Sequence, residues 1–350
     1  MPDITLYDRA TLDTVYRFQK LPTKQFWLPQ FGRQLNFDTP YIMWDRVYGD
    51  DRGLAPFVLP NVKGRPQKLQ TYDSIKFAPA YSKIKDVVTP EMHIERVPGE
   101  NPIVGNLSIE QRRDAVKAEL LRRQKIKFAN LEEWMACQAL TKGSVVVQGE
   151  DYPAVTVDFR RDGSLTIVKA GNATWDTVGV DPLADLKAAR IAVNNLSGTT
   201  VNKYVFGGNA WGAFAKRVNL RDLMDKNYGG QQVNVSLISD GYDGQEYMGY
   251  IQGPDGQGRL DLWVDNSKYV DETGTLQFYM DQDTVVGIGN GFDGIRCYGA
   301  IFDARAGFQP LTRFFKNWLE EDPSHEYILG QTSPLMVPKN PNTTFSMRVR

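Results

Sequence analysis

The chain has 350 residues, of which 41% are hydrophobic, 24% charged and 11% aromatic, enough for a sizeable core in one elaborate domain or in two or three packing units. Its 41 basic and 42 acidic side chains give a formal net charge of −1. Proteins that hold nucleic acid by their own electrostatics normally carry a basic excess. Tight general binding of DNA is therefore disfavoured, whereas a surface that merely faces packed DNA is permitted.

Cysteine usage and hydropathy argue against two further classes. The two cysteines, Cys137 and Cys297, form no C-x-x-C pair, which speaks against a disulfide scaffold or a structural zinc site and fits a reducing compartment. The first residues lack the layout of a signal peptide, and no apolar run approaches the roughly 20 residues that a membrane span requires. We expect a protein that is made in the cytoplasm and does not enter a membrane.

The stretch 26–102 is rich in proline and shows no helical periodicity, so it is expected to be extended or looped. So long a stretch without a helix is too much for an ordinary loop in a compact domain. It is nevertheless rich in aromatic residues, among them Trp27 and Trp44, unlike disordered segments. We therefore expect an extended arm whose apolar side chains are covered by another copy of the chain.

A long helix is predicted over about 108–142. Ser108 and Gln111 have the spacing of a capping box, apolar residues follow at intervals of three or four, and Gly143 is a suitable stop. Its basic residues form either a strip that meets DNA or an acidic neighbour, or a solvated helix face, and the pattern leaves both open. They are Arg112, Arg113, Lys117, Arg122, Arg123, Lys125 and Lys127.

The rest of the chain is predicted to alternate strands and helices. A strand over 155–159 is expected to turn at Asp162-Gly163 into a second strand at 165–168. Helices are expected from Asp181-Pro182 to about 196, near 209–218 and near 220–228. Further strands are expected at 260–264, 276–280, 284–288 and 295–302, with the tail segments 326–329 and 344–349 returning to an earlier sheet.

Motifs that carry chemistry are weak. Residues 289–294 match G-x-G-x-x-G, but strand-like residues follow, so a turn or glycine-rich hairpin is favoured over a nucleotide site. The histidines, His93 and His325, have no metal-ligand spacing, and the carboxylates of 240–246 and 281–283 are best explained as solvated turns. We therefore expect no catalytic, cofactor-binding or metal-binding residues and no enzyme activity.

An ordered series of short matches resembles the major head protein family of phage lambda, within the Hong Kong 97-type fold of tailed-phage coat proteins. The matches run from 77 to the C-terminus, and the series as a whole carries the resemblance. They are 77–83 (FAPAYSK), 88–90 (VTP), 96–100 (RVPGE), 142–143 (KG), 152–155 (YPAV), Trp211, 296–299 (RCYG), 315–318 (FKNW), 322–323 (DP) and 331–336 (QTSPLM).

The resemblance implies an α+β fold in four parts. These are an N-terminal arm (1–44), an extended loop over a neighbouring subunit (45–92), a peripheral domain with the spine helix (93–175 and 320–350) and an axial domain (176–319). It implies a shell of hexamers and pentamers that encloses double-stranded DNA without sequence-specific binding, forms as a procapsid and expands. It also implies scaffolding, portal and decoration proteins as partners.

Contacts between subunits are expected at the arm, the loop and the basic helix. The basic loop 61–68 has the character of a hairpin tip that seeks acidic groups on another subunit, and equally that of an ordinary exposed loop. The expected contact residues are Trp27, Trp44, Lys63, Arg65, Lys68, Arg112, Arg113, Arg122 and Arg123. Two alternatives remain: an encapsulin-type shell that stores protein cargo, and a β-rich carbohydrate-active enzyme.

Overall fold

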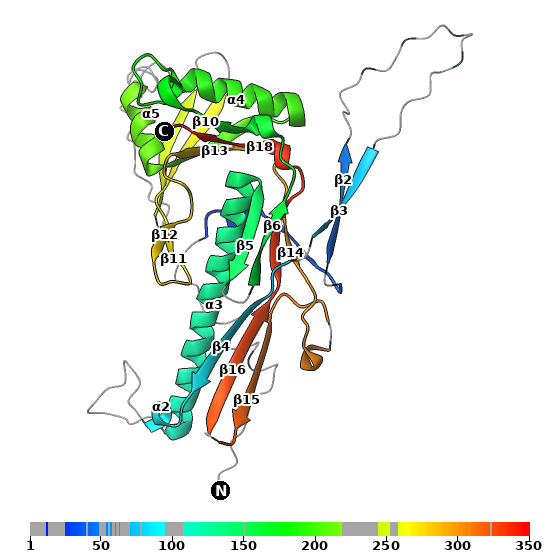
Figure 1. Ribbon diagram of the computed structural model, residues 1–350, viewed down its shortest axis with the longest axis vertical. Helices are drawn as coiled ribbons and strands as arrows, with labels where there is room; N and C mark the ends of the chain where they lie inside the picture. The colour runs from blue at the N-terminus through cyan, green and yellow to red at the C-terminus, as the bar shows by residue number, and fades with distance from the viewer. Residues whose placement is uncertain are drawn as a thin grey trace.

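The computed structural model describes residues 12, 25–39, 41–48, 54, 57, 60, 63, 71–77, 79–94, 108–149, 152–218, 244–252, 258–307, 309–322 and 324–350. Within these ranges, 44–48, 71–75, 93, 94, 152 and 252 are described by their backbone alone. The helix expected near 220–228 lies outside the described residues. The chain folds around one long helix, with a large sheet at one end and smaller sheets along its length (Figure 1).

The long helix, α3 (Ile109–Lys142), confirms the predicted boundaries. Ser108 and Gln111 make both bonds of the capping box, and Gly143 ends the helix in the left-handed conformation with φ of 67°. Glycine adopts that conformation without the steric cost that a Cβ would add. At 1.5 Å per residue the helix is about 50 Å long, so its two ends pack against different parts of the molecule.

The sheet at the C-terminal end of α3 has six strands in the order β7-β18-β13-β8-β10-β9. Helices α4 (Pro182–Ser197) and α5 (Gly208–Arg217) cover one of its faces, and α3 approaches from the other side (Figure 1). Asp181 and Gly198 cap α4 as predicted. The strands are β7 (Thr166–Val168), β8 (Val201–Gly207), β9 (Gln245–Gln252), β10 (Arg259–Asp265), β13 (Thr284–Gly289) and β18 (Thr344–Arg348).

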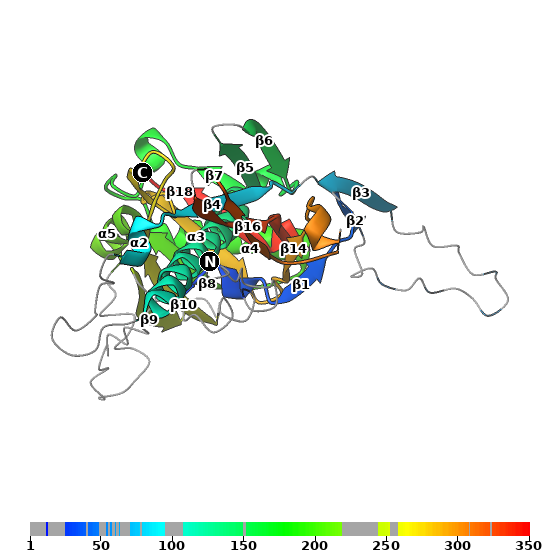
Figure 2. The same ribbon diagram turned by 90° about the horizontal axis from the view of Figure 1, so that it is seen from below.

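Two three-stranded sheets run beside α3, as the view along the helix also shows (Figure 2). One pairs β15 (Phe314–Glu320), β16 (His325–Thr332) and β4 (Ser82–Val88), and it packs Phe315 and Ile328 on Phe128 and Leu121 of α3. The other pairs β1 (Arg33–Asn36), β14 (Gly294–Tyr298) and β17 (Pro334–Pro338). The N-terminal and C-terminal thirds of the chain thus share both sheets.

Three two-stranded units complete the fold. They are β2–β3 (Ile42–Tyr48, Thr71–Phe77), β5–β6 (Ser144–Gly149, Tyr152–Asp158) and β11–β12 (Lys268–Val270, Leu276–Phe278). The pair β2–β3 stands off to one side of the body (Figure 1). Besides these strands, the described part of 26–102 holds only one turn each of 3-10 helix (η1, Leu28–Gln30) and α-helix (α2, Glu91–Ile94), which confirms its extended character.

Two predicted hairpins are wrong, because their strands join different sheets. The turn at Asp162 and Gly163 is a short 3-10 helix; β6 before it pairs with β5, and β7 after it pairs with β18. The glycine turn 289–294 likewise joins β13, which pairs with β8 and β18, to β14, which pairs with β1 and β17. A strand follows this turn, so no helix N-terminus faces the glycines as a nucleotide site would require.

Candidate functional site

Residues 26–31 lie against α3 and are held there by one buried carboxylate. Glu133 of α3 accepts hydrogen bonds from the backbone N–H groups of Phe26 (2.8 Å), Trp27 (2.7 Å) and Leu28 (2.8 Å). These bonds satisfy three donors that would otherwise be buried without partners. Burial raises the pKa of Glu133, although the three backbone bonds oppose that shift.

The side chain of Trp27 is 0% exposed within its own chain, which corrects the expectation that another copy must cover it. Its indole N–H donates to Asp265 at the end of β10 (2.8 Å), and its ring meets Phe26 edge-on. Phe31 is equally buried and packs against Phe292. These aromatic residues belong to the largest core cluster, so a partner inside the same chain replaces the expected neighbour.

Apolar side chains farther along the first third remain uncovered. Leu54 is 96% exposed and Phe57 105% exposed, and Met43 on β2 is 65% exposed. Lys76 lies 3.7 Å from the ring centre of the half-exposed Tyr41. Large exposed apolar groups such as these are typical of a protein interface.

Of the other contact residues expected in this region, Trp44 pairs with Ile75 through the backbone, and its side chain lies outside the described part of the structure. Lys63 is exposed. Arg65 and Lys68 also lie outside the described residues. The contacts predicted for these four residues therefore stay predictions.

Two cations of the α3 strip are turned into the protein's own interior. Arg113 and Lys117 pair with Glu326 of β16 at 3.1 Å and 2.7 Å, and the side chains of Lys117 and Glu326 are 2% and 4% exposed. Burial alone would raise the pKa of Glu326, but the bond and charge of Lys117, with the charge of Arg113, hold it below the ordinary value. Arg113 and Lys117 therefore belong neither to a strip that faces DNA nor to a solvated helix face.

The remaining cations of the strip are half-buried or exposed. Arg122 and Arg123 pair with Glu119 on the same helix at 2.7 Å and 3.1 Å. The hydrogen bond from Arg122 is the main cause that lowers the pKa of Glu119 to about 2. Arg112 is half-buried near the start of α3. Arg122 and Arg123 therefore remain available for an acidic neighbour, with part of their charge already balanced.

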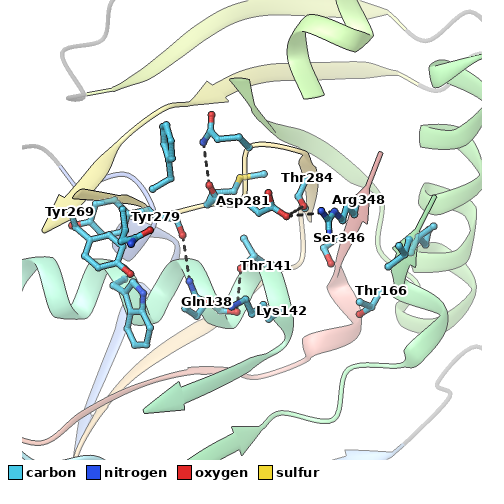
Figure 3. Close-up of a pocket in the computed structure, with 17 residues that line it drawn as sticks. Gln138, Thr141, Lys142, Thr166, Tyr269, Tyr279, Asp281, Thr284, Ser346 and Arg348 are labelled. Atoms are coloured by element: carbon cyan, nitrogen blue, oxygen red, sulfur yellow. Dashed lines mark hydrogen bonds and ion pairs between the residues drawn. The ribbon is translucent and has the colours of Figure 1, made fainter. Parts of the chain in front are cut away.

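A cavity of about 620 Å³ separates the C-terminal end of α3 from the six-stranded sheet (Figure 3). Its walls include Gln138 of α3, Tyr269 and Tyr279 from around β11–β12, and Arg348 of β18. Gln138 donates to the carbonyl of Tyr279 at 3.4 Å, and Arg348 lies 4.0 Å from Asp281. The cavity therefore lies beside the place where apolar side chains of α3 pack with those of β8 and β13 in one core cluster.

Three acids organise these contacts and were not predicted from the sequence: Glu133, Asp265 and Glu326. One signal for Glu133 is present, because Glu132 and Glu133 are the only charged residues in the apolar stretch 128–140 of the helix. Acids in such a place are rarely buried without partners. No comparable signal marks Asp265 or Glu326: Trp27 lies 238 residues from Asp265, and Arg113 lies 213 residues from Glu326.

The described residues contain neither a cluster of metal ligands nor a helix that could span a membrane. No cluster of three or more His, Cys, Asp or Glu side chains is arranged to hold a metal ion in that part of the chain. No helix of the same residues has both the length and the apolar character needed to cross a membrane.

The chain is similar in sequence and structure to known proteins. Over 343 residues, the chain is 27% identical to the P21 prophage-derived major head protein of Escherichia coli O6:H1, covering 96% of this chain and 97% of the relative. It is 29% identical to the major capsid protein of Escherichia phage lambda, covering 85% of each. A crystal structure described as a prophage capsid protein of E. coli CFT073 superposes with a TM-score of 0.73 at 21% identity, over 99% of this chain and 100% of that one.

These likenesses confirm the predicted fold, the Hong Kong 97-like fold of phage coat proteins. The family model described as phage major capsid protein E matches residues 10–349, nearly the whole chain. The chain belongs to the phage major capsid protein E family.

Proposed function

We propose that this protein is the major capsid subunit of a tailed phage and self-assembles into the hexamers and pentamers of an icosahedral head around double-stranded DNA. The observation that carries the proposal is the uncovered apolar surface around β2–β3. Leu54 and Phe57 are almost fully exposed, and Met43 keeps 65% of its surface exposed. At about 25 cal/mol per Å² of apolar surface, covering such side chains on a second copy favours association.

The remaining charges fit the same function. A near-neutral chain encloses DNA without holding it tightly, since nonspecific affinity for DNA grows with the number of phosphates neutralised. The outward Arg122 and Arg123 supply a basic contact for an acidic surface on a neighbour, and Lys63 on the loop supplies another. We extend this contact role to Trp44, Arg65, Lys68 and Arg112.

The proposal keeps the four parts expected from the resemblance, namely arm (1–44), loop (45–92), peripheral domain (93–175 and 320–350) and axial domain (176–319). Strand pairing supports shifting some borders. β7 and β18 pair within the axial sheet, and β15 crosses the border at 319–320 to pair with β16. Scaffolding, portal and decoration proteins are the proposed partners, and α3 with the arm would absorb the expansion of the shell.

Electron microscopy and light scattering of the purified full-length protein test the proposal. Closed shells, or capsomers that close when phage partners are added, are the expected result. A monomer or small oligomer that never closes under any of these conditions would contradict it and would favour an enzyme instead. Shells filled with protein cargo and lacking DNA after a phage infection would favour the encapsulin-type alternative.

A further inference from the structure

The three-stranded sheet β15–β16–β4 has one face packed on α3 and another that its own chain leaves partly uncovered. Phe315 and Ile328 are buried on the first face. On the other face Trp318 lies directly opposite Tyr327 and stacks on it, with 5.3 Å between ring centres and 26° between ring planes. Both rings are half-buried, and Val87 beside them is 37% exposed. We call this side of the sheet, with Val87, Trp318 and Tyr327, the open face.

Two lysines of β4 belong to the open face. Lys85 places its ammonium group 3.8 Å from the centre of the Tyr327 ring and 5.5 Å from that of Trp318. Lys83, two residues earlier, lies 5.1 Å from the centre of the Tyr81 ring. Both lysine side chains are exposed. Neither forms an ion pair with a carboxylate in the part of the chain that the structure describes.

The ring contacts give these lysines more than a protective role. β4 is an edge strand, where lysines often serve only to keep other strands from pairing. A cation that lies over an aromatic ring is already ordered, so it loses less side-chain freedom when it binds an anion. Lys316 on the same face is paired with Asp303, which leaves Lys83 and Lys85 as cations suited to an acidic group on another molecule.

The turn between β15 and β16 carries the opposite charge. Glu320, Glu321 and Asp322 follow one another there, and all three side chains are exposed. Glu320 shares a hydrogen bond with Tyr327, whereas Glu321 and Asp322 have no ion pair within the described residues. This acidic turn (320–322) lies at the end of the molecule opposite the six-stranded sheet, where a neighbouring molecule has access to it (Figure 1).

Backbone pairing keeps the two sets of charges apart within one chain. Lys85 pairs with Leu329, and β16 begins four residues before that, at His325. Four residues of a strand span about 13 Å, well beyond the roughly 4 Å of an ion pair. A single molecule therefore leaves the cations of the open face and the carboxylates of the turn unpaired with each other.

We propose that the acidic turn of one copy of this chain binds the open face of a second copy, with Glu321 and Asp322 meeting Lys83 and Lys85. This inference rests on the proposed function, because it names one contact through which the subunits of a shell are joined. The turn and the open face are different surfaces of the same chain, so the contact is head-to-tail. Such a contact repeats from copy to copy until a ring closes.

Zero-length cross-linking of the unaltered full-length protein tests the contact directly. A carbodiimide joins a lysine amine to a carboxylate only where the two touch, and mass spectrometry of digested shells identifies the linked peptides. We expect Lys83 or Lys85 joined to Glu321 or Asp322 in shells, and roughly tenfold less of these products in subunits kept apart by high salt. Shells without these products would overturn the inference and leave the proposed function standing, whereas a protein that never forms shells would overturn both.

Charge exchange between the two surfaces is an independent test. Lys83→Glu with Lys85→Glu, and separately Glu321→Lys with Asp322→Lys, should each lower the yield of shells roughly tenfold or more, because like charges then face each other. A variant with all four substitutions restores opposite charges across the contact and should recover most of the yield. Normal yield from either pair alone, or no recovery in the combined variant, would overturn the inference.

A matched control separates the contact from an effect of net charge. Lys216→Glu with Lys268→Glu alters the net charge by the same amount at two exposed lysines, on α5 and β11, and should leave the yield of shells unchanged. An equal loss in this control would assign the effect to net charge and overturn the inference. Urea midpoints of the unassembled subunits show whether each variant folds, and the cross-linking result on the unaltered chain stands even if one does not.

Discussion

Two neighbouring regions of the first third both contain aromatic residues and proline but are covered to different extents. They are residues 26–31, which include the 3-10 helix η1, and residues 42–77, which include β2 and β3. The first region binds two buried carboxylates and packs against apolar side chains of its own chain, which cover Phe26, Trp27 and Phe31. The second keeps Leu54 and Phe57 exposed.

The comparison teaches that aromatic content alone does not say which chain will cover a side chain. Both regions find backbone partners within the chain, since β2 pairs with β3, and what distinguishes them is whether the body of the protein also covers the side chains. Glu133 supplies three bonds to the first region, and these fix the segment in one place before any neighbour is present.

The largest loss of stability is expected from Trp27→Ala. Removing a fully buried tryptophan costs about 3–5 kcal/mol, and the change also leaves Asp265 without one of its donors. The free energy of unfolding is measured by urea denaturation of the unassembled subunit. The control is Tyr41→Ala, on the half-exposed aromatic residue beside β2; equal losses for the two variants would remove the distinction between the regions.

Glu326→Gln is expected to follow, at about 3 kcal/mol near neutral pH, because it leaves Lys117 buried without its ion partner. The pKa of Glu326 is lowered in the folded state, so its contribution is present above pH 4.5 and is lost as the pH falls through the lowered value. The difference between the two proteins should therefore shrink in acid. Glu272→Gln, at an exposed position between β11 and β12, is the control, and an equal effect there would argue against the buried pair.

The double variant Arg122→Ala with Arg123→Ala should leave the urea midpoint of the subunit unchanged within error, since exposed ion pairs contribute little. If these residues meet an acidic neighbour, the same variant lowers the yield of shells, and more strongly in low salt than in high salt. A marked loss of subunit stability would instead place them in the interior network with Arg113 and Lys117.

The smallest effect on the subunit and a large effect on assembly are expected from Leu54→Ser with Phe57→Ser. Surface substitutions without own-chain contacts change stability by about 0.5 kcal/mol or less. Val178→Ser alters another highly exposed apolar residue, outside the loop 45–92, and serves as the comparison. Shells forming as well as in the unaltered protein would show that Leu54 and Phe57 are not part of an interface.

Local signals allowed much of the fold to be predicted. The ends of α3 and α4 follow from a Ser or Asp before the first turn and a glycine after the last, and alternation places most of the strands. Pairing between distant segments is different in kind. Nothing in the pattern of 33–36 shows that it pairs in parallel with 295–298. β6 and β7 follow each other along the chain with the spacing of a hairpin, but they enter different sheets.

The same limit explains which site residues were found. The exposed cations Arg122 and Arg123 could be predicted because their partner, Glu119, is on the same helix. The burial of Lys117 depends on Glu326, which is far away in the sequence. Trp27 was assigned to a neighbour because its acceptor, Asp265, lies on a strand that only the folded chain brings close.

Hydroxyl-radical footprinting of Trp27, Met43 and Phe57 in the unassembled subunit and in the assembled shell tests the central claim most directly, since it reports side-chain exposure. We expect Met43 and Phe57 to react strongly in the subunit and to be protected in the shell, while Trp27 stays unreactive in both. A reactive Trp27 that becomes protected only on assembly, or Met43 and Phe57 equally reactive in both states, would contradict the account.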